Sequence, residues 1–515
     1  MSKNRNETTS SNLSTLHRKS FLSILNTSLT IPLGLVSVYF VSHYFGPDGI
    51  GSFSYALAFV ASFSVILDMG TSSSHVKRIS EGFDEARCIG TFLSIKLFLA
   101  LIYGLIIIVA IQLIKSKESS YFIDVVELMI YLLVLSKILG SITLVMTQTF
   151  VAKTQTALAV FPALIEKISN VMLKVIACIS GFSLVYLAVS NLFGVLIMLL
   201  VLLFLFRHKN INYPNLKYIK SYVIFGLPLF ILSFADAIMS SMDKLIIGNF
   251  LGVYEVGLYS APQTFIWPST IIGVSISSLI MPISSSYISE GKVDLAKNLL
   301  YKAESYISLF FGPIIIFSIF TSEILVHYFL GNDFSPSVEY VKFFAISSLF
   351  FSLSQPFISF LIASEKLKLL ASISIISVSL NLFLNLILVP NSLSGVEVLG
   401  WGAKGAIIST IFTYFFTYIT FRYYCDVKTN RSLIILVIKL TISIFPALFI
   451  IETYSLSFLN FLGVISCLFL IIVNTLIYLL ILYFLNELTK DQINNIFSTL
   501  NPSKMVAYIR QEINE

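Results

Sequence analysis

The chain has 515 residues, of which 57% are hydrophobic and only 12% are charged, with a formal net charge of +6 and a mean hydropathy of +0.90. Soluble proteins carry about 25% charged residues, so this composition excludes a soluble globular domain. The four cysteines are scattered and form no CxxC pair, which argues against a disulfide framework and against a metal site. We expect no cofactor.

Apolar runs long enough to cross a bilayer recur from Phe21 to Leu485. They predict an all-α polytopic membrane protein with about 14 transmembrane helices. A membrane barrel would instead show short alternating segments. No small-residue cleavage pattern follows the first run, which favours a retained helix over a signal peptide. The expected spans are 20–43, 51–69, 92–114, 122–147, 160–180, 182–206, 223–248, 256–282, 304–329, 340–363, 369–389, 403–421, 433–451 and 462–485.

Lysine and arginine outside these spans are concentrated in alternate loops and in the two tails. By the positive-inside rule, that side is cytoplasmic. We therefore expect a multi-pass protein of the cytoplasmic membrane with both termini in the cytoplasm. The remaining loops are short, so only the tails, residues 1–19 and 486–515, lie outside the membrane as segments of any length.

A glycine-spaced phrase occurs twice, as YFGPDGIGSFSYA from Tyr44 and as FLGVYEVGLYSAP from Phe250. Two further echoes follow in corresponding loops, ISEG at 79–82 and 288–291, and FVAKTQ at 150–155 with LIASEK at 361–366. When the first phrase is aligned, the matching pairs are Gly46 with Gly252, Gly51 with Gly257, and Ser54 with Ser260. We expect the glycines to form tight turns rather than to touch a ligand.

These echoes predict two pseudo-symmetric six-helix bundles, residues 20–206 and 223–421, followed by an extra helix pair at 433–485. Because six spans is an even number, both bundles enter the membrane in the same direction. Such parallel repeats are related by an axis along the membrane normal, and the substrate binds between them near the midplane.

Ionisable groups inside spans are costly, so they normally face a cavity or a partner. In the seventh span, Ser233, Asp236, Ser240 and Asp243 share one face. Carboxylate and hydroxyl oxygens suit a proton or a sodium ion, so Asp236 and Asp243 are candidates for ion coupling, with Asp236 favoured. Hydrogen bonding between helices through small polar residues is the structural alternative.

Candidate substrate-binding residues come from several spans. Lys167 and Lys174 share one face of the fifth span, while Glu166 points about 100° away. Two stacked ammonium groups suit a pyrophosphate in a cavity of low dielectric constant, and ion pairing with neighbouring helices is the alternative. The other candidates are Lys137 in the fourth span, Arg78 at the cytoplasmic mouth, and Asn26 and Thr30 on the polar face of the first span.

Several motifs resemble the MOP exporter superfamily, and in particular its polysaccharide and O-antigen flippase branch. They are DMGTSSSHVKRISEG at 68–82, MDKLIIGNFLGVYEVGLYSAP at 242–262, with its Asp-Lys pair, and GWGAKGAIIST at 400–410. The extra helix pair at the end also matches that branch. The resemblance covers residues 18–486.

The resemblance implies a flippase, not an enzyme, that carries a polyprenyl-pyrophosphate-linked oligosaccharide to the outer leaflet by alternating access of two bundles in a V. The family often places cations in the central cavity, whereas this first helix has only Arg18 and Lys19, at its mouth. The implied partners are the lipid-linked oligosaccharide, membrane lipid, a coupling proton or sodium ion, and glycan polymerases or glycosyltransferases. We expect no nucleic acid.

Two alternatives remain open. A cation-coupled multidrug or metabolite antiporter of the same superfamily usually has twelve spans, so the last helix pair argues against it. A membrane glycan polymerase or glycosyltransferase needs sizeable outer loops rich in acidic groups and arginine, and the outer loops here are short and poor in arginine.

Overall fold

The computed structural model describes residues 2–115, residues 124–426 and a few positions between 472 and 480. Nine helices within this part of the chain are long and apolar enough to cross a membrane. The chain is an all-α membrane protein, as its composition predicts. The expected helix pair at 433–485 lies outside the described residues, apart from those few positions, as does the tail at 486–515.

The first half contains six α-helices and one short 3-10 turn. They are α1 (Ser2–Ser64), η1 (Val65–Leu67), α2 (Thr71–Ser80), α3 (Glu85–Lys115), α4 (Asp124–Ala152), α5 (Thr156–Ile179) and α6 (Tyr186–Phe206). The first two expected spans are the two arms of α1, which meet at Gly46. This glycine has φ 63° and ψ −163°, a conformation that reverses the chain within one residue and that a side chain would strain.

The second half contains the remaining helices and one small hairpin. They are α7 (Leu216–Leu251), α8 (Val253–Ile266), η2 (Trp267–Thr270), α9 (Ile271–Ser289), α10 (Val293–Ile324), the π-helical turn η3 (Leu325–Leu330), η4 (Asn332–Ser337), α11 (Val338–Ala363), α12 (Leu367–Leu388), the strands β1 (Ser392–Leu393) and β2 (Val396–Glu397), and α13 (Gly402–Tyr424). Ser392 pairs with Glu397 across the hairpin.

The three sequence echoes adopt matching backbone conformations in the two halves. Gly252 has φ 94° and ψ 174°, close to the geometry of Gly46. Gly82 and Gly291 have φ 85° and 75°, and each donates its amide to the residue three positions earlier at 3.0 Å. Thr154 and Glu365 both have φ 57°. The prediction of two pseudo-symmetric bundles is confirmed.

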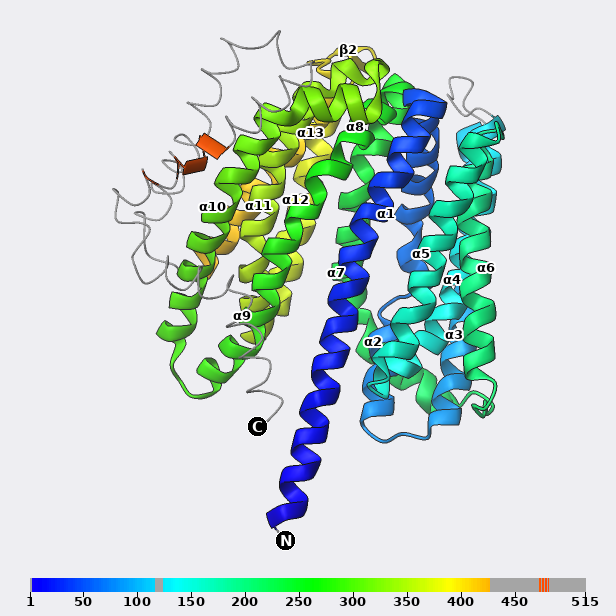
Figure 1. The fold of residues 1–515 in the computed structure, drawn as a ribbon, viewed down its shortest axis with the longest axis vertical. Helices are drawn as coiled ribbons and strands as arrows, with labels where there is room; N and C mark the ends of the chain where they lie inside the picture. The colour runs from blue at the N-terminus through cyan, green and yellow to red at the C-terminus, as the bar shows by residue number, and fades with distance from the viewer. Residues whose placement is uncertain are drawn as a thin grey trace.

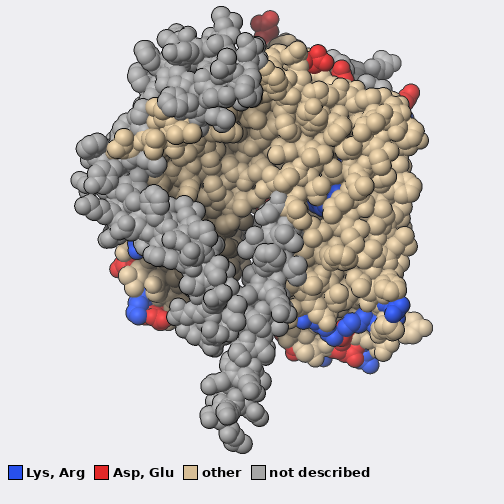
Figure 2. Space-filling view, viewed as in Figure 1, with Lys and Arg blue, Asp and Glu red and all other residues tan. Residues whose placement is uncertain are grey.

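The two halves lean together at one end and separate toward the other (Figure 1). We call the end with Gly46 and Gly252 the apical end, and the end with Gly82 and Gly291 the basal end. The amino terminus lies at the basal end, and α7 runs between the halves (Figure 1). Lysine and arginine side chains gather at the basal end together with some acidic ones, whereas the charged side chains that show along the apical rim are acidic (Figure 2). This asymmetry follows the loop charges.

The halves meet apically through the close approach of the second arm of α1 and α8. A Cβ added at Gly51 would lie 1.7 Å from the carbonyl oxygen of Val253, and one at Gly257 would lie 2.0 Å from that of Pro47. These glycines therefore permit backbone contact between helices, and they are not turn residues as the sequence suggested. Among the glycines of the two phrases, only Gly46 and Gly252 have a positive φ.

Candidate functional site

A cavity of about 430 Å³ lies mostly within the first half, with α8 of the second half forming one side, on the basal side of the glycine contact. Its walls come from both arms of α1, from α5 and α6, and from α8 of the second half. The residues that line it include Thr30, Leu33, Ser37, Phe53, Ser54, Glu166, Lys167, Asn170, Lys174, Asn191, Ser260 and Thr264. Because α8 forms one side, the cavity borders the interface between the two bundles, where transporters built from such repeats bind their substrate.

The repeated phrase supplies a matched pair of hydroxyl groups to the cavity. Ser54 and Ser260, three residues after Gly51 and Gly257, both line it. The Ser260 hydroxyl is buried and has no hydrogen-bond partner among the described residues. The phrase therefore does two things, because its glycines join the halves and its serines face the space below.

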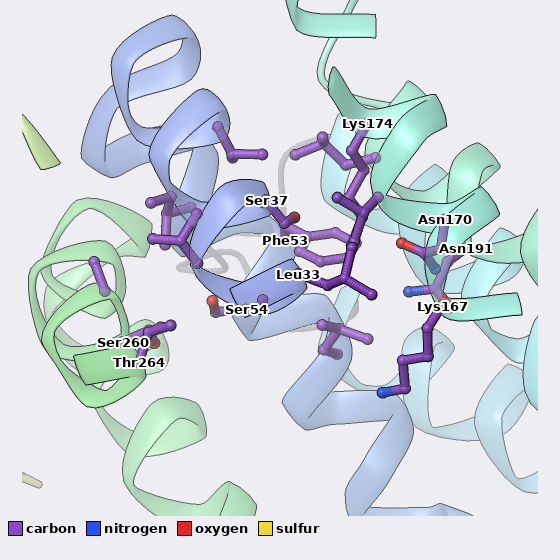
Figure 3. Close-up of a pocket in the computed structure, with 18 of the residues that line it drawn as sticks. Leu33, Ser37, Phe53, Ser54, Lys167, Asn170, Lys174, Asn191, Ser260 and Thr264 are labelled. Carbon is purple, nitrogen blue, oxygen red and sulfur yellow. The ribbon is translucent and has the colours of Figure 1, made fainter. Parts of the chain in front are cut away.

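Two lysines of α5, Lys167 and Lys174, line this cavity (Figure 3). The Lys174 ammonium lies 4.7 Å from the centre of the Phe53 ring, on the second arm of α1. This cation–π contact orients the lysine and leaves its other face available. Lys167, two turns earlier on α5, is exposed. The two ammonium groups provide the positive charge that the first helix lacks.

Three polar residues of the same wall were missed as site residues. Glu166 was expected to point away from the lysines, but it also lines the cavity, together with Asn170 and Asn191. A Cβ at Gly194 would lie 3.4 Å from the Glu166 carboxylate, so the missing side chain of this glycine leaves room for it. The two asparagines lie within otherwise apolar spans, and that is the signal that could have identified them.

The other substrate-binding candidates are placed differently. Thr30 lines the cavity, whereas the side chain of Asn26 lies outside the described residues. Lys137 is exposed on α4, within electrostatic range of Glu166 and Lys167, but it is not among the lining residues. Arg78 lies at the basal end of α2, where it donates to Glu81 at 2.6 Å and stacks near Phe83.

The polar stripe of α7 divides into an exposed part and a buried part. Ser233, Asp236 and Ser240 are exposed, whereas Asp243 is buried. The Asp243 carboxylate accepts hydrogen bonds from Thr410 at 2.6 Å, from Tyr259 at 2.5 Å and from Asn385 at 2.9 Å. Four helices, α7, α8, α12 and α13, therefore converge on one carboxylate near the apical end of α7.

This buried cluster continues along α12. Asn381 and Asn385 lie one turn apart and are fully buried, and both amides hydrogen-bond the Ser409 hydroxyl. The Asn385 amide oxygen has no hydrogen-bond partner among the described residues. The asparagine pair was not predicted as a site, although two amides at helical spacing in an apolar span are an unusual signal.

Each half also contains a buried ion pair that explains other charges in the spans. In the first half, the fully buried Lys96 ammonium binds Asp68 at 2.6 Å and the Leu67 carbonyl at 2.8 Å. In the second half, Arg422 pairs with Glu304, whose carboxylate also accepts the Tyr418 hydroxyl at 2.7 Å. Neither pair lines the central cavity, so both have structural roles.

Comparison with solved structures identifies the fold. The structure resembles the lipid II flippase MurJ in an inward closed conformation, with a TM-score of 0.68 and 16% sequence identity over 90% of this chain and 98% of that chain. It also resembles a multidrug resistance MATE family transporter of the MOP superfamily. The inward-facing form gives a TM-score of 0.60 at 17% identity, covering 78% of this chain and 96% of that chain. The outward-facing form gives 0.55 at 14% identity, covering 80% and 95%.

Comparison by sequence identifies the family. Residues 44–339 match the family model described as polysaccharide biosynthesis protein. No curated protein matches the sequence. The matched segment extends from the first glycine phrase to the start of α11, and so includes the cavity walls contributed by the second arm of α1 and by α5, α6 and α8. The chain therefore belongs to the polysaccharide biosynthesis protein family and has the transporter fold of the MOP superfamily.

Proposed function

We propose that the chain is a flippase that moves a polyprenyl-pyrophosphate-linked oligosaccharide from the inner to the outer leaflet for the synthesis of surface polysaccharide. The observation that carries the proposal is the central cavity, in which Lys167 and Lys174 lie beside hydroxyl and amide groups. A pyrophosphate needs the ammonium groups, and a glycan needs the uncharged polar groups. The match of residues 44–339 to a family described as polysaccharide biosynthesis protein supports this proposal.

The arrangement of the two halves supports alternating access. The apical end is held closed by the contact of α1 with α8, where two backbones touch without intervening side chains. We assign the basal end to the cytoplasm, because the loop lysines and arginines gather there. We further propose that the protein lies in the plasma membrane and, from the even number of spans that the sequence predicts, that both termini are cytoplasmic. In this orientation the substrate enters from the basal side and leaves apically.

The two bundles, 20–206 and 223–421, would act as the moving parts, with the helix pair at 433–485 as an addition to the second. A return to the basal-open state without substrate needs an energy source, for which we propose a proton or a sodium ion. Asp243 is better placed than Asp236 to bind it, because two hydroxyl groups, of Tyr259 and Thr410, lie at its carboxylate and the Asn385 amide that donates to it has an oxygen without a partner among the described residues. Oxygen ligands of this kind suit hard cations.

The resemblance to multidrug transporters leaves an antiporter of small molecules as the main competing function. The family match favours the flippase, because it names polysaccharide biosynthesis. A glycan polymerase is disfavoured, because the family and the fold are those of transporters and flippases. Glycosyltransferases and polymerases remain candidate partners that supply or consume the substrate.

The experiment is a transport assay with the purified protein in liposomes. The probe is a short-chain polyprenyl pyrophosphate that carries a fluorescent hexose, and its exposure in the outer leaflet is measured with an impermeant quencher. We expect protein-dependent translocation that requires Lys174. Lys404→Gln is the matched control, because Lys404 is an exposed lysine paired with Glu339 at 2.7 Å, outside the cavity. Transport of cationic drugs without translocation of this probe would overturn the proposal.

A further inference from the structure

The α5 wall of the cavity carries three different kinds of polar group in order. Glu166, Asn170 and Lys174 are spaced four residues apart, so they lie on one face on successive turns, about 6 Å apart along the axis. The helix runs toward the apical end, because Gly181, just beyond it, lies against Tyr44. Along this face the wall therefore changes from an anion at its basal side, through an amide, to a cation at its apical side, and Lys167, next to Glu166, adds a second cation to the basal part of the cavity.

Helices α5 and α6 pack closely around the part of this wall that contains Glu166. Asn170 is buried, and a Cβ at Gly194 would lie 3.2 Å from the Asn170 Cβ as well as 3.4 Å from the Glu166 carboxylate. Gly194 therefore lets α6 approach until Asn191, one turn earlier, reaches the same part of the cavity. In Figure 3 the amides of Asn170 and Asn191 occupy one region of the wall.

The Glu166 carboxylate pairs with the neighbouring Asn170 amide and keeps further acceptor positions for a ligand. It lies within electrostatic range of Lys167, Lys174 and Lys137, but no salt bridge within 4 Å joins it to a lysine in the described part of the chain. A carboxylate accepts hydrogen bonds, and each amide both donates and accepts them. This combination matches the hydroxyl groups of a sugar, which need both kinds of partner.

We propose that Glu166, Asn170 and Asn191 form a subsite for the first sugar of the lipid-linked glycan, and that Glu166 selects an uncharged sugar over an acidic one. The inference rests on the proposed function and deepens it. The pyrophosphate binds at Lys174, and the sugar attached to it lies one to two helical turns toward the basal side. A uronic acid at that place would bring a second carboxylate next to Glu166, and like charges that are close together in a cavity repel.

The test is equilibrium binding to the purified full-length protein in lipid nanodiscs. Three synthetic ligands share one short polyprenyl pyrophosphate, and they carry no sugar, a glucose or a glucuronate. We expect the glucose ligand to bind about tenfold tighter than the bare pyrophosphate and about tenfold tighter than the glucuronate ligand, as expected for one hydrogen bond to a charged group gained or lost. Lys174→Gln should weaken all three by a similar factor.

The decisive variant is Glu166→Gln, which keeps the shape and removes the charge. We expect it to bring the ratio of glucose to glucuronate affinity close to one, while Lys404→Gln leaves the ratio unchanged. Asn191→Asp, a second variant, should increase the discrimination against glucuronate. Thermal unfolding of each variant checks that it is folded, and Asn191→Asp keeps the test informative if Glu166→Gln fails to fold.

The possible failures are distinguishable. If Glu166→Gln changes the affinity of all three ligands equally, Glu166 only neutralises the lysines and the sugar subsite is wrong. The subsite is also wrong if the wild-type protein binds all three ligands equally through Lys174, although the flippase proposal then stands. If none of the three ligands binds the wild-type protein, the proposed function itself fails.

Discussion

Gly51 and Gly257 pack against each other's helices in a reciprocal way. The Cβ position of Gly51 lies 1.7 Å from the Val253 carbonyl oxygen, and that of Gly257 lies 2.0 Å from the Pro47 carbonyl oxygen. Gly51 corresponds to Gly257 in the repeat, and Pro47 corresponds to Val253, so both contacts are the same contact made twice about a pseudo-twofold axis. The repeated phrase is thus an interface that joins the two halves apically.

Gly51→Ala should weaken this apical closure. The added methyl group cannot fit beside a backbone carbonyl, and overpacking of this kind costs about 1–3 kcal/mol. We expect the protein to spend more time in a form that is open apically. The measurement is labelling of Ser54→Cys, a cavity position, by an impermeant thiol reagent added on the apical side, in a background without native cysteines.

Gly140→Ala is the control for this change, because a Cβ at this helical glycine would meet nothing within 4 Å. It should leave the labelling rate unchanged. Gly257→Ala should act like Gly51→Ala, and the double variant should show less than the sum of the two effects, because both residues belong to one interface. An unaltered labelling rate in both single variants would show that the contact does not close the apical end.

The orientation of the chain in the membrane gives a second prediction. A reporter fused after Ser392, in the apical hairpin, should be active outside the cytoplasm, and one fused after Asn212 should be active inside. Both positions are exposed, so the fusion point is accessible. Alkaline phosphatase and a fluorescent protein report the two sides. The opposite pair of results would reverse the assignment of the basal end to the cytoplasm.

Most of the architecture was predictable from the sequence, because helix length, loop charge and internal repeats each reflect one backbone or bilayer constraint. The twelve expected spans up to 421 all lie on helices that the structure describes. Side-chain surroundings were harder to predict. The face of a single helix does not show what a neighbouring helix contributes, so the room that Gly194 of α6 leaves for Glu166 could not be predicted.

The buried cluster shows the same limit. Asp243 was expected on one polar stripe with Asp236, since both lie on the same side of α7. The stripe begins in an exposed part of α7 and ends at Asp243. There the apical end of the helix packs against α8, α12 and α13. The periodicity of one helix predicts the direction in which a side chain points. The packing of four helices determines that Asp243 is buried while Asp236 is exposed.

The cavity lysines give a third prediction. Lys174→Gln should lower the export of surface polysaccharide at least tenfold, because it removes charge-assisted hydrogen bonds to phosphate, and Lys167→Gln should lower it less, because it removes positive charge from the basal part of the same cavity. Lys137→Gln should have a smaller effect, since Lys137 is not among the residues that line the cavity. The measurement is polysaccharide at the cell surface, normalised to the amount of protein in the membrane. Normal export in both α5 variants would show that these lysines do not form a cationic substrate site.

The last prediction separates the two aspartates of α7. Asp243→Asn replaces one carboxylate oxygen by an amide that donates hydrogen bonds, although Thr410 and Tyr259 already donate to one oxygen and Asn385 donates to the other. Leaving such buried donors without an acceptor costs about 1–3 kcal/mol, so the variant should unfold at a lower temperature. Asp236→Asn, at an exposed position, should change the stability by no more than about 0.5 kcal/mol.

The same two variants test the ion coupling. If Asp243 binds the coupling ion, transport in liposomes that carry Asp243→Asn should no longer respond to an imposed proton or sodium gradient, while Asp236→Asn should respond like the parent. Conservative replacement of a donor, Thr410→Ser, keeps the hydroxyl and should retain the response, which separates loss of the ion from loss of packing. A sodium-dependent rise in the unfolding temperature of the parent, absent in Asp243→Asn, would identify sodium as the ion. A full gradient response in Asp243→Asn would exclude Asp243, and its loss in Asp236→Asn would move the coupling site to the exposed stripe of α7.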